Sequence, residues 1–150
     1  MVRLLASIVI LLAVVALVLG VVFVVQGVTK NNELKEAMRV EHIVLGVEGA
    51  ETTGQVIDTL EEAKTAGDII REHRRGIAAT YEDLLGGQHF NPEDPRQLTY
   101  AQALNLENYL YLAVVAFGLV TISLGAGVFM IVTSLALGAT GVVLLKLPQA

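Results

Sequence analysis

The chain contains no cysteine. It therefore forms no disulfide and offers no thiolate for a zinc or iron–sulfur site, and its redox compartment cannot be inferred from cysteine usage. Serine is also scarce, because it occurs only at Ser7, Ser123 and Ser134, each within an apolar stretch. These two shortages disfavour nucleophilic catalysis. We expect a protein that is not an enzyme, with no catalytic residue and no cofactor.

Charged residues are also scarce. Only 17% of the residues are charged, against about 25% in an average soluble protein. The deficit is concentrated in two blocks, residues 4–25 and 109–145, which contain no charged residue. About 20 apolar residues are enough to cross a bilayer core of roughly 30 Å. Both ends of the chain are therefore predicted to lie in a membrane, and the lipid bilayer is its first expected partner.

The first block is predicted to be an uncleaved anchor. Its apolar run is longer than the roughly 7 to 15 residues of a signal sequence, and no small-residue cleavage site follows it. Arg3 and the free amine favour a cytoplasmic N-terminus. The middle segment would then be extracytoplasmic in a multi-pass protein of the plasma (inner) membrane. All 15 acids lie between the two blocks, and this acidity argues against a nucleic-acid partner.

The second block is too long for a single crossing. As one helix its 37 residues would measure about 55 Å, against a bilayer core of roughly 30 Å. Gly125 and Gly127 lie near its middle, where glycine could turn the backbone. A hairpin with arms over 104–124 and 128–146 is predicted. One long helix that leaves the membrane towards a partner subunit is the alternative.

These predictions together define a fold class. It is mainly α, with three transmembrane helices and a small helical extramembrane domain. Its parts are an N-terminal anchor over residues 1–28, an extracytoplasmic domain over 29–103 and a transmembrane hairpin over 104–147.

Small residues recur four positions apart in the apolar blocks. This spacing allows helix backbones to approach closely in lipid, whereas the frequency of small residues in membrane helices offers a plainer explanation. We expect the packing to lie within the chain, between copies of it, or against other membrane subunits. The pairs are Ala16 with Gly20, Thr121 with Gly125, Ser123 with Gly127, and Ser134 with Gly138.

The middle segment shows helix signals. Asp58 with Glu61 predicts a helix start, and Gly76 predicts its end. The bases between them suit the negative end of a helix dipole; they are Arg71, His73, Arg74 and Arg75. Residues 38–47 include β-branched residues that allow one short strand, while residues 31–38 could instead prolong the first helix.

Further along, Thr80 with Asp83 predicts a short helix that ends at Gly86 and Gly87. Two prolines indicate a loop over residues 88–97. Thr99 with Gln102 predicts the start of the helix that enters the membrane. The tyrosines beyond it suit the headgroup belt; they are Tyr100, Tyr109 and Tyr111.

Three histidines suggest a metal or small-ligand site, because imidazoles and carboxylates can hold iron or zinc. They are His42, His73 and His89. Their spacings of 31 and 16 residues match no local metal motif, so we expect no metal there. His73 is interpreted as a helix-end cation, and His89 as a solvated loop residue.

The segment AGDIIREHRRGIAATYEDLL and the later VVAFG resemble a group of small bacterial integral membrane proteins of unknown function. The resemblance is carried by Ala66, Asp68, Ile70, His73, Tyr81, Leu84 and residues 114–118, while Gly67 departs from the pattern. It implies the layout described above. Some members are labelled aromatic ring-opening dioxygenases, but no spacing here supplies the facial triad that such an iron enzyme needs.

The sequence therefore favours a non-enzymatic subunit or scaffold of a membrane assembly. The alternative is a membrane-anchored module that binds or senses a small ligand or a metal.

Overall fold

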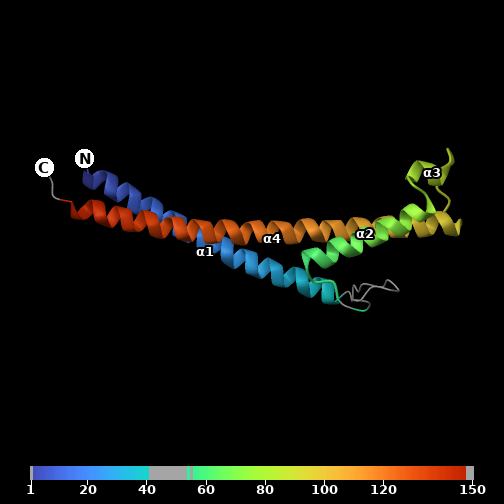
Figure 1. The fold of residues 1–150 in the computed structure, drawn as a ribbon, viewed down its shortest axis with the longest axis horizontal. Coiled ribbons are helices and arrows are strands. Elements are labelled where there is room, and N and C mark those ends of the chain that lie inside the picture. The colour runs from blue at the N-terminus through green and yellow to red at the C-terminus, as the bar shows by residue number, and fades with distance from the viewer. Residues whose placement is uncertain (1, 41–53, 55, 148–150) are drawn as a thin grey trace. The chain divides into compact units, whose positions relative to one another are not determined.

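The computed structural model describes residues 2–40, 54 and 56–147. Across these residues the chain is mainly helical and contains no strand, which confirms the mainly α class (Figure 1). The elements are α1 (Val2–Val40), α2 (Leu60–Ile77), α3 (Tyr81–Leu85) and α4 (Pro95–Lys146). Residues 31–38 prolong α1, and the rest of the segment considered for a strand, residues 41–47, lies outside the described residues.

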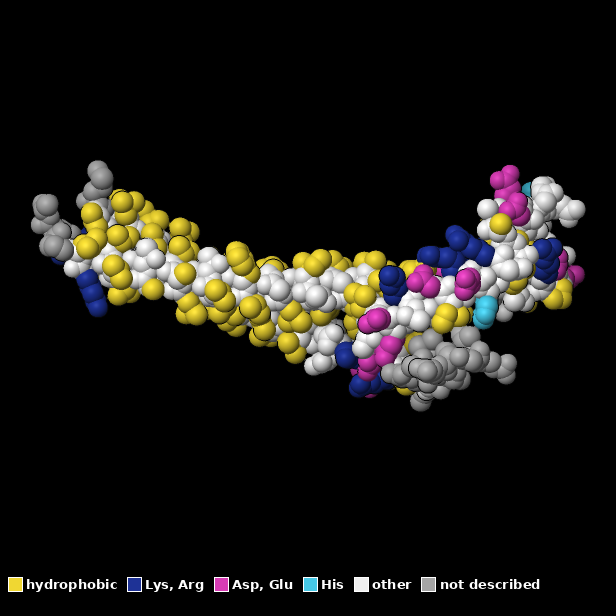
Figure 2. Space-filling model, in the orientation of Figure 1, with side chains coloured by type: hydrophobic (Ala, Val, Ile, Leu, Met, Phe, Trp, Pro, Cys, Tyr) yellow, Lys and Arg dark blue, Asp and Glu magenta, His cyan; other side chains and the backbone are white. Residues whose placement is uncertain are grey.

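The chain divides into two compact units. The first consists of Met1–Asn32 and Leu119–Ala150, and the second of Glu33–Gly118. Large apolar side chains cover the visible surface of α1 and α4 in the first unit, whereas charged side chains gather on the second (Figure 2).

The first unit is an antiparallel pair of helices. Gly141 lies against Ile10, Gly127 against Gly20, and Gly27 against Leu124, so residue numbers rise along α1 as they fall along α4. α4 is unbroken through Gly125 and Gly127. The predicted hairpin is therefore wrong, and with it the separate third membrane helix.

A physical reason for the unbroken helix lies in what Gly127 contacts. Glycine costs only about 1 kcal/mol relative to alanine inside a helix. Gly127 faces the backbone of α1 at a distance that leaves no room for a side chain. Its lack of a side chain thus serves close helix packing, and no turn is needed there.

Two of the described helices, α1 and α4, are long and apolar enough to cross a membrane. Only 11% of the most apolar window in each is buried, unlike the core helix of a soluble protein, which is mostly covered. The large side chains of these windows point outward. This exposure is consistent with association with a membrane.

The second unit has a small core between α2 and the segments of α1 and α4 that belong to it. Seven buried apolar residues form the larger cluster: Met38, Ile57, Ala63, Ala66, Leu110, Ala113 and Phe117. A smaller cluster of Ala78, Leu84 and Tyr100 joins α3 to the beginning of α4. The small residues along α2 allow it to lie close to α4, with Gly67 directly beside Leu110 and Tyr111.

Helix α2 begins one residue later than predicted. Thr59 is the N-cap and forms a capping box with Glu62, so Asp58 and Glu61 do not play those roles. Asp58 instead binds Arg39 of α1 at 2.6 Å and lies 3.8 Å from Lys35. Aspartate and threonine are both favourable N-caps, with aspartate ranked somewhat higher, but these ion pairs engage the aspartate elsewhere.

Helix α2 also ends later than predicted. It continues through Gly76 to Ile77, and Ala78 closes it. The terminal carbonyl of Ile77 accepts a hydrogen bond from Arg96 at 2.5 Å. The basic side chain that binds the C-terminal end of α2 is therefore Arg96 of α4.

The prediction for α3 is confirmed. Thr80 and Asp83 form a capping box, and Gly86 closes the helix at a left-handed φ of 56°. The start of α4 was placed wrongly, because the helix begins at Pro95 and not near Thr99. Asp94 accepts a hydrogen bond from the Arg96 amide at 2.9 Å, and proline is well suited to a first helical position, where no amide donor is needed.

Candidate functional site

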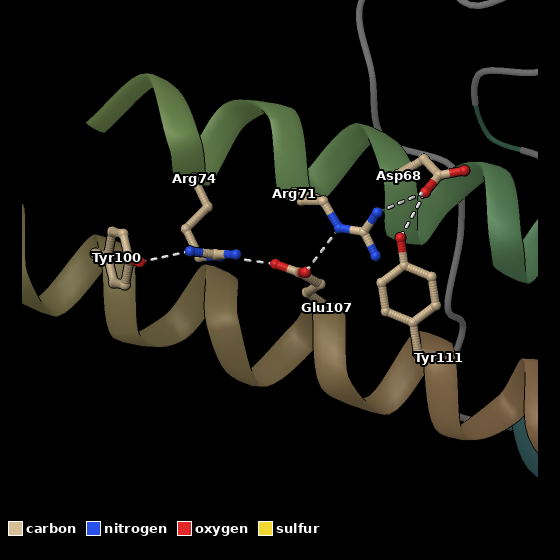
Figure 3. Close-up of polar contacts among 6 residues, drawn as sticks. All are labelled: Asp68, Arg71, Arg74, Tyr100, Glu107 and Tyr111. Carbon is tan, nitrogen blue, oxygen red and sulfur yellow. Dashed lines mark hydrogen bonds and ion pairs between the residues drawn. The ribbon is translucent and has the colours of Figure 1, made fainter. Parts of the chain in front are cut away.

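The polar centre of the second unit is a network between α2 and α4, which we call the charged cluster (Figure 3). Glu107 accepts hydrogen bonds from Arg74 at 2.7 Å and from Arg71 at 3.1 Å. A tyrosine lies at each end of this network. Arg74 donates a hydrogen bond to the Tyr100 hydroxyl at 2.5 Å, and the Tyr111 hydroxyl donates one to Asp68 at 2.5 Å. The charged cluster comprises Asp68, Arg71, Arg74, Tyr100, Glu107 and Tyr111.

Both arginines also lie over aromatic rings. The guanidinium carbon of Arg71 is 4.5 Å from the centre of the Tyr111 ring, and that of Arg74 is 4.9 Å from the centre of the Tyr100 ring. Such contacts attract a cation to the ring face. Each arginine is thus held by a carboxylate and by a ring, and this leaves Arg74 only 8% exposed.

The electrostatics of the charged cluster favour its ionised form. Burial opposes the charge on Glu107, but hydrogen bonds from Arg74 and Arg71 outweigh it and lower the pKa of Glu107. The hydrogen bond to Glu107 raises the pKa of each arginine. Burial and then the hydrogen bond to Asp68 raise the pKa of Tyr111 to about 12. Tyr111 therefore remains a donor at neutral pH.

This arrangement corrects two interpretations of the sequence. The bases Arg71 and Arg74 do not simply complement a helix end, because they bind Glu107, which lies 36 and 33 residues further along the chain. Tyr100 is 1% exposed and belongs to a core, so it does not serve a headgroup belt. The sequence contains a weak signal of this cluster. Tyr100, Glu107 and Tyr111 are separated by seven and four residues, and this spacing places them on one face of a helix.

The ionisation of Glu107 predicts a pH dependence. Because its pKa is lower in the folded state, its contribution is complete above the ordinary value of 4.5 and is lost as the pH falls through the folded pKa. Wild-type protein should unfold at a higher temperature than Glu107→Gln at neutral pH, and the gap should close in acid. Thermal unfolding followed by circular dichroism in detergent measures this gap, with the exposed Glu72→Gln as a control whose gap stays small throughout. A gap for Glu107→Gln that persists in strong acid would contradict the assignment.

The second candidate feature is the contact between α1 and α4 in the first unit. A side-chain carbon placed on Gly20 would lie 2.9 Å from the carbonyl oxygen of Gly127, and one on Gly127 would lie 2.8 Å from the carbonyl oxygen of Gly20. The two backbones therefore touch here. A side-chain carbon placed on Gly27 would lie 2.7 Å from the side chain of Leu124, and one placed on Gly141 would lie 2.6 Å from the side chain of Ile10.

The small residues of this contact repeat every seven positions and are buried. We call this set the small-residue seam; it consists of Ala6, Ala13, Gly20 and Gly27 on α1 with Gly127, Ser134 and Gly141 on α4. A seven-residue repeat keeps one stripe of each helix facing the other along their length. The sequence prediction followed spacings of four residues, and it therefore did not include Gly27 and Gly141, which lie on the seven-residue repeat.

The predicted packing residues divide into two groups. Gly20, Gly127 and Ser134 belong to the small-residue seam, and the Ser123 hydroxyl donates to the carbonyl of Phe23 at 3.2 Å. Of the others, Gly138 is in ordinary contact with Ala13, Gly125 faces open space, Ala16 is half-buried and Thr121 is exposed.

The histidines do not form a site within the described residues. His73 and His89 are both exposed, and His42 lies outside the described residues. Among the residues that are described, no group of three histidines, aspartates or glutamates is arranged to hold a metal ion.

No protein-family model, curated protein or solved structure matches this chain. The resemblance to small bacterial membrane proteins therefore stays a prediction, and the function is inferred from the charged cluster and the small-residue seam.

Proposed function

We propose that this protein is a non-enzymatic integral membrane protein that serves as a subunit or scaffold of a membrane assembly. One observation carries the proposal. In the first unit the small side chains are used in the contact between α1 and α4, while large apolar side chains such as Leu11 and Phe129 are 63% and 71% exposed. Large apolar side chains are stable when apolar lipid tails cover them. Helices in lipid associate through close packing of small residues, as α1 and α4 do here.

The charged cluster supports a structural role for the second unit. Its carboxylates, guanidinium groups and hydroxyls bind one another, and no buried side-chain nitrogen or oxygen among the described residues lacks a partner. A catalytic group must be able to reach a substrate, whereas Arg74 and Glu107 are closed off by their mutual contacts. The cluster fixes α2 on α4 within the second unit.

The continuity of α4 revises the topology that we propose. Because α1 and α4 are antiparallel and unbroken, the chain crosses the bilayer twice and its two ends lie on the same side. Arg3 and Lys146 mark these ends, and positive residues favour the cytoplasmic side. At the other end of α1, Lys35 and Arg39 are both paired with Asp58. We infer an extracytoplasmic second unit in the plasma (inner) membrane.

The topology gives a direct prediction. Reporters fused to the N-terminus and after Gln149 should both report the cytoplasm, and a reporter inserted after Gly87, between α3 and α4, should report the opposite side. A pair of reporters, one active only in the cytoplasm and one only outside it, measures this. Opposite locations for the two ends would disprove two crossings and restore an odd number.

Purification of the tagged full chain from its native membrane in a mild detergent tests whether it belongs to an assembly. The proteins that copurify with it are then identified. The proposal expects further copies or other membrane proteins in a fixed ratio. A matched purification of a Gly127→Leu variant, which disturbs the small-residue seam, shows which companions depend on the packing of α1 against α4. Recovery of the chain from the soluble fraction would overturn the proposed function.

A further inference from the structure

An apolar groove lies between α1 and α4 in the first unit, and its volume is about 310 Å³. Its floor is recessed because the residues there are small: Ala13 and Ser134 belong to the small-residue seam, and Gly138 has no side chain. Larger apolar side chains form its walls, and they include Leu17, Leu135 and Val142. The groove therefore accepts an apolar chain.

Two basic residues continue the stripes of the helices that line the groove. Arg3 lies seven residues before Ile10, and Lys146 lies seven residues after Ala139. Seven residues are close to two helical turns, so each base lies on the same side of its helix as a groove residue. The antiparallel contact of Gly141 with Ile10 places both bases beyond the same end of the groove.

These two bases have no acid nearby to neutralise them. Residues 1–32 and 119–150, which make up the first unit, contain no aspartate or glutamate. Along the helices the nearest acids are Glu33 and Glu107, which are 30 and 39 residues away, or roughly 45 and 58 Å. Both Arg3 and Lys146 are exposed. An anion that pairs with them must therefore come from another molecule.

Two bases at the end of an apolar groove match the chemistry of an anionic phospholipid, which joins a negative headgroup to apolar tails. Basic sites between transmembrane helices bind such headgroups on the cytoplasmic side. An apolar helix of a partner would fill the groove but would leave both cations without an anion. A zwitterionic phospholipid carries its own cation and adds no net negative charge.

We propose that the groove holds a tail of an anionic phospholipid whose headgroup binds Arg3 and Lys146. This inference rests on the proposed function, which places the beginning of α1 and the end of α4 at the cytoplasmic leaflet. That leaflet is the one whose surface is negative.

Native mass measurement of the full chain in mild detergent tests the headgroup contact. The probes are phosphatidylglycerol, which is anionic, and phosphatidylcholine with the same tails, which is zwitterionic. The wild type should retain several-fold more phosphatidylglycerol. Each base contributes about fivefold to such an attraction, so Arg3→Gln with Lys146→Gln should weaken phosphatidylglycerol binding roughly 25-fold. Equal retention of the two lipids by the wild type, or unchanged binding by the double variant, would overturn the proposal.

Lys30→Gln is the matched control for the bases. It removes the remaining base of the first unit, which lies 27 residues from Arg3 along α1, and it should bind phosphatidylglycerol like the wild type.

A second pair of variants tests the groove while both bases are kept. Ala139→Leu places a large side chain in the groove and should weaken phosphatidylglycerol binding several-fold. Ala136→Leu, at an exposed position of α4 that does not line the groove, should not. If the two variants bind the lipid equally well, the tail does not lie in the groove and the proposal is wrong.

The outcome can be separated from that of the proposed function. A chain that is embedded in the membrane with both ends cytoplasmic, yet shows no preference for phosphatidylglycerol, would disprove only the lipid site. A chain absent from the membrane fraction would instead disprove the proposed function.

Discussion

Replacement of Gly127 by leucine is expected to force α1 and α4 apart in the first unit. The first carbon of the new side chain would lie 2.8 Å from the Gly20 carbonyl oxygen and 2.9 Å from the Val24 amide nitrogen. Both are backbone atoms, which cannot move aside as a flexible side chain can. Overpacking of this kind costs about 3 kcal/mol, and thermal aggregation in detergent should begin at a clearly lower temperature.

Gly125→Leu is the matched control. It lies two residues away on the same helix, and nothing lies within 4 Å of a carbon placed there. It should therefore behave like the wild type. If both variants are equally impaired, the small-residue seam has no special role and the loss reflects glycine content alone.

A disulfide can report the same helix contact directly. A side-chain carbon on Gly138 would lie 3.9 Å from the Cβ of Ala13, and a disulfide needs about 3.5 to 4.5 Å between these atoms. The pair Ala13→Cys with Gly138→Cys should close readily in a cysteine-free chain. The same pair should close poorly once Gly127→Leu is added, and should still close with Gly125→Leu.

Glu107→Leu is expected to be the most damaging single change in the second unit. Glu107 is 7% exposed and is the shared partner of two arginines. Its removal leaves Arg74 buried beside an apolar side chain, and loss of one member of a buried ion pair costs about 3 kcal/mol. Thermal unfolding and hydrogen exchange of the α2 amides should both show the loss.

The double variant Glu107→Leu with Arg74→Leu separates charge from packing. A buried ion pair replaced by apolar residues is often neutral, so this variant should recover much of the stability. If the single variant is as stable as the wild type, the charged cluster does not hold α2 on α4. If the double variant is worse than the single one, the contribution of Arg74 is its packing on Tyr100.

Several features of this protein could be predicted from the sequence because their causes are local. The two uncharged blocks follow from composition, and both form long apolar helices. The capping box of Thr80 with Asp83 and the glycine end of α3 involve residues within one turn of each other. In such cases hydrogen bonding along a few residues is enough to determine the structure.

The tertiary structure decided what local signals left ambiguous. Gly125 and Gly127 are equally able to turn a chain, but Gly127 packs on the backbone of α1 and the helix continues. Asp58 and Thr59 are both good caps, and the ion pair with Arg39 leaves the role to Thr59. Arg71 and Arg74 suited a helix end, yet they bind Glu107 more than 30 residues away. Each outcome depends on which helix faces which, because burial and ion pairing act between segments that are distant in the chain.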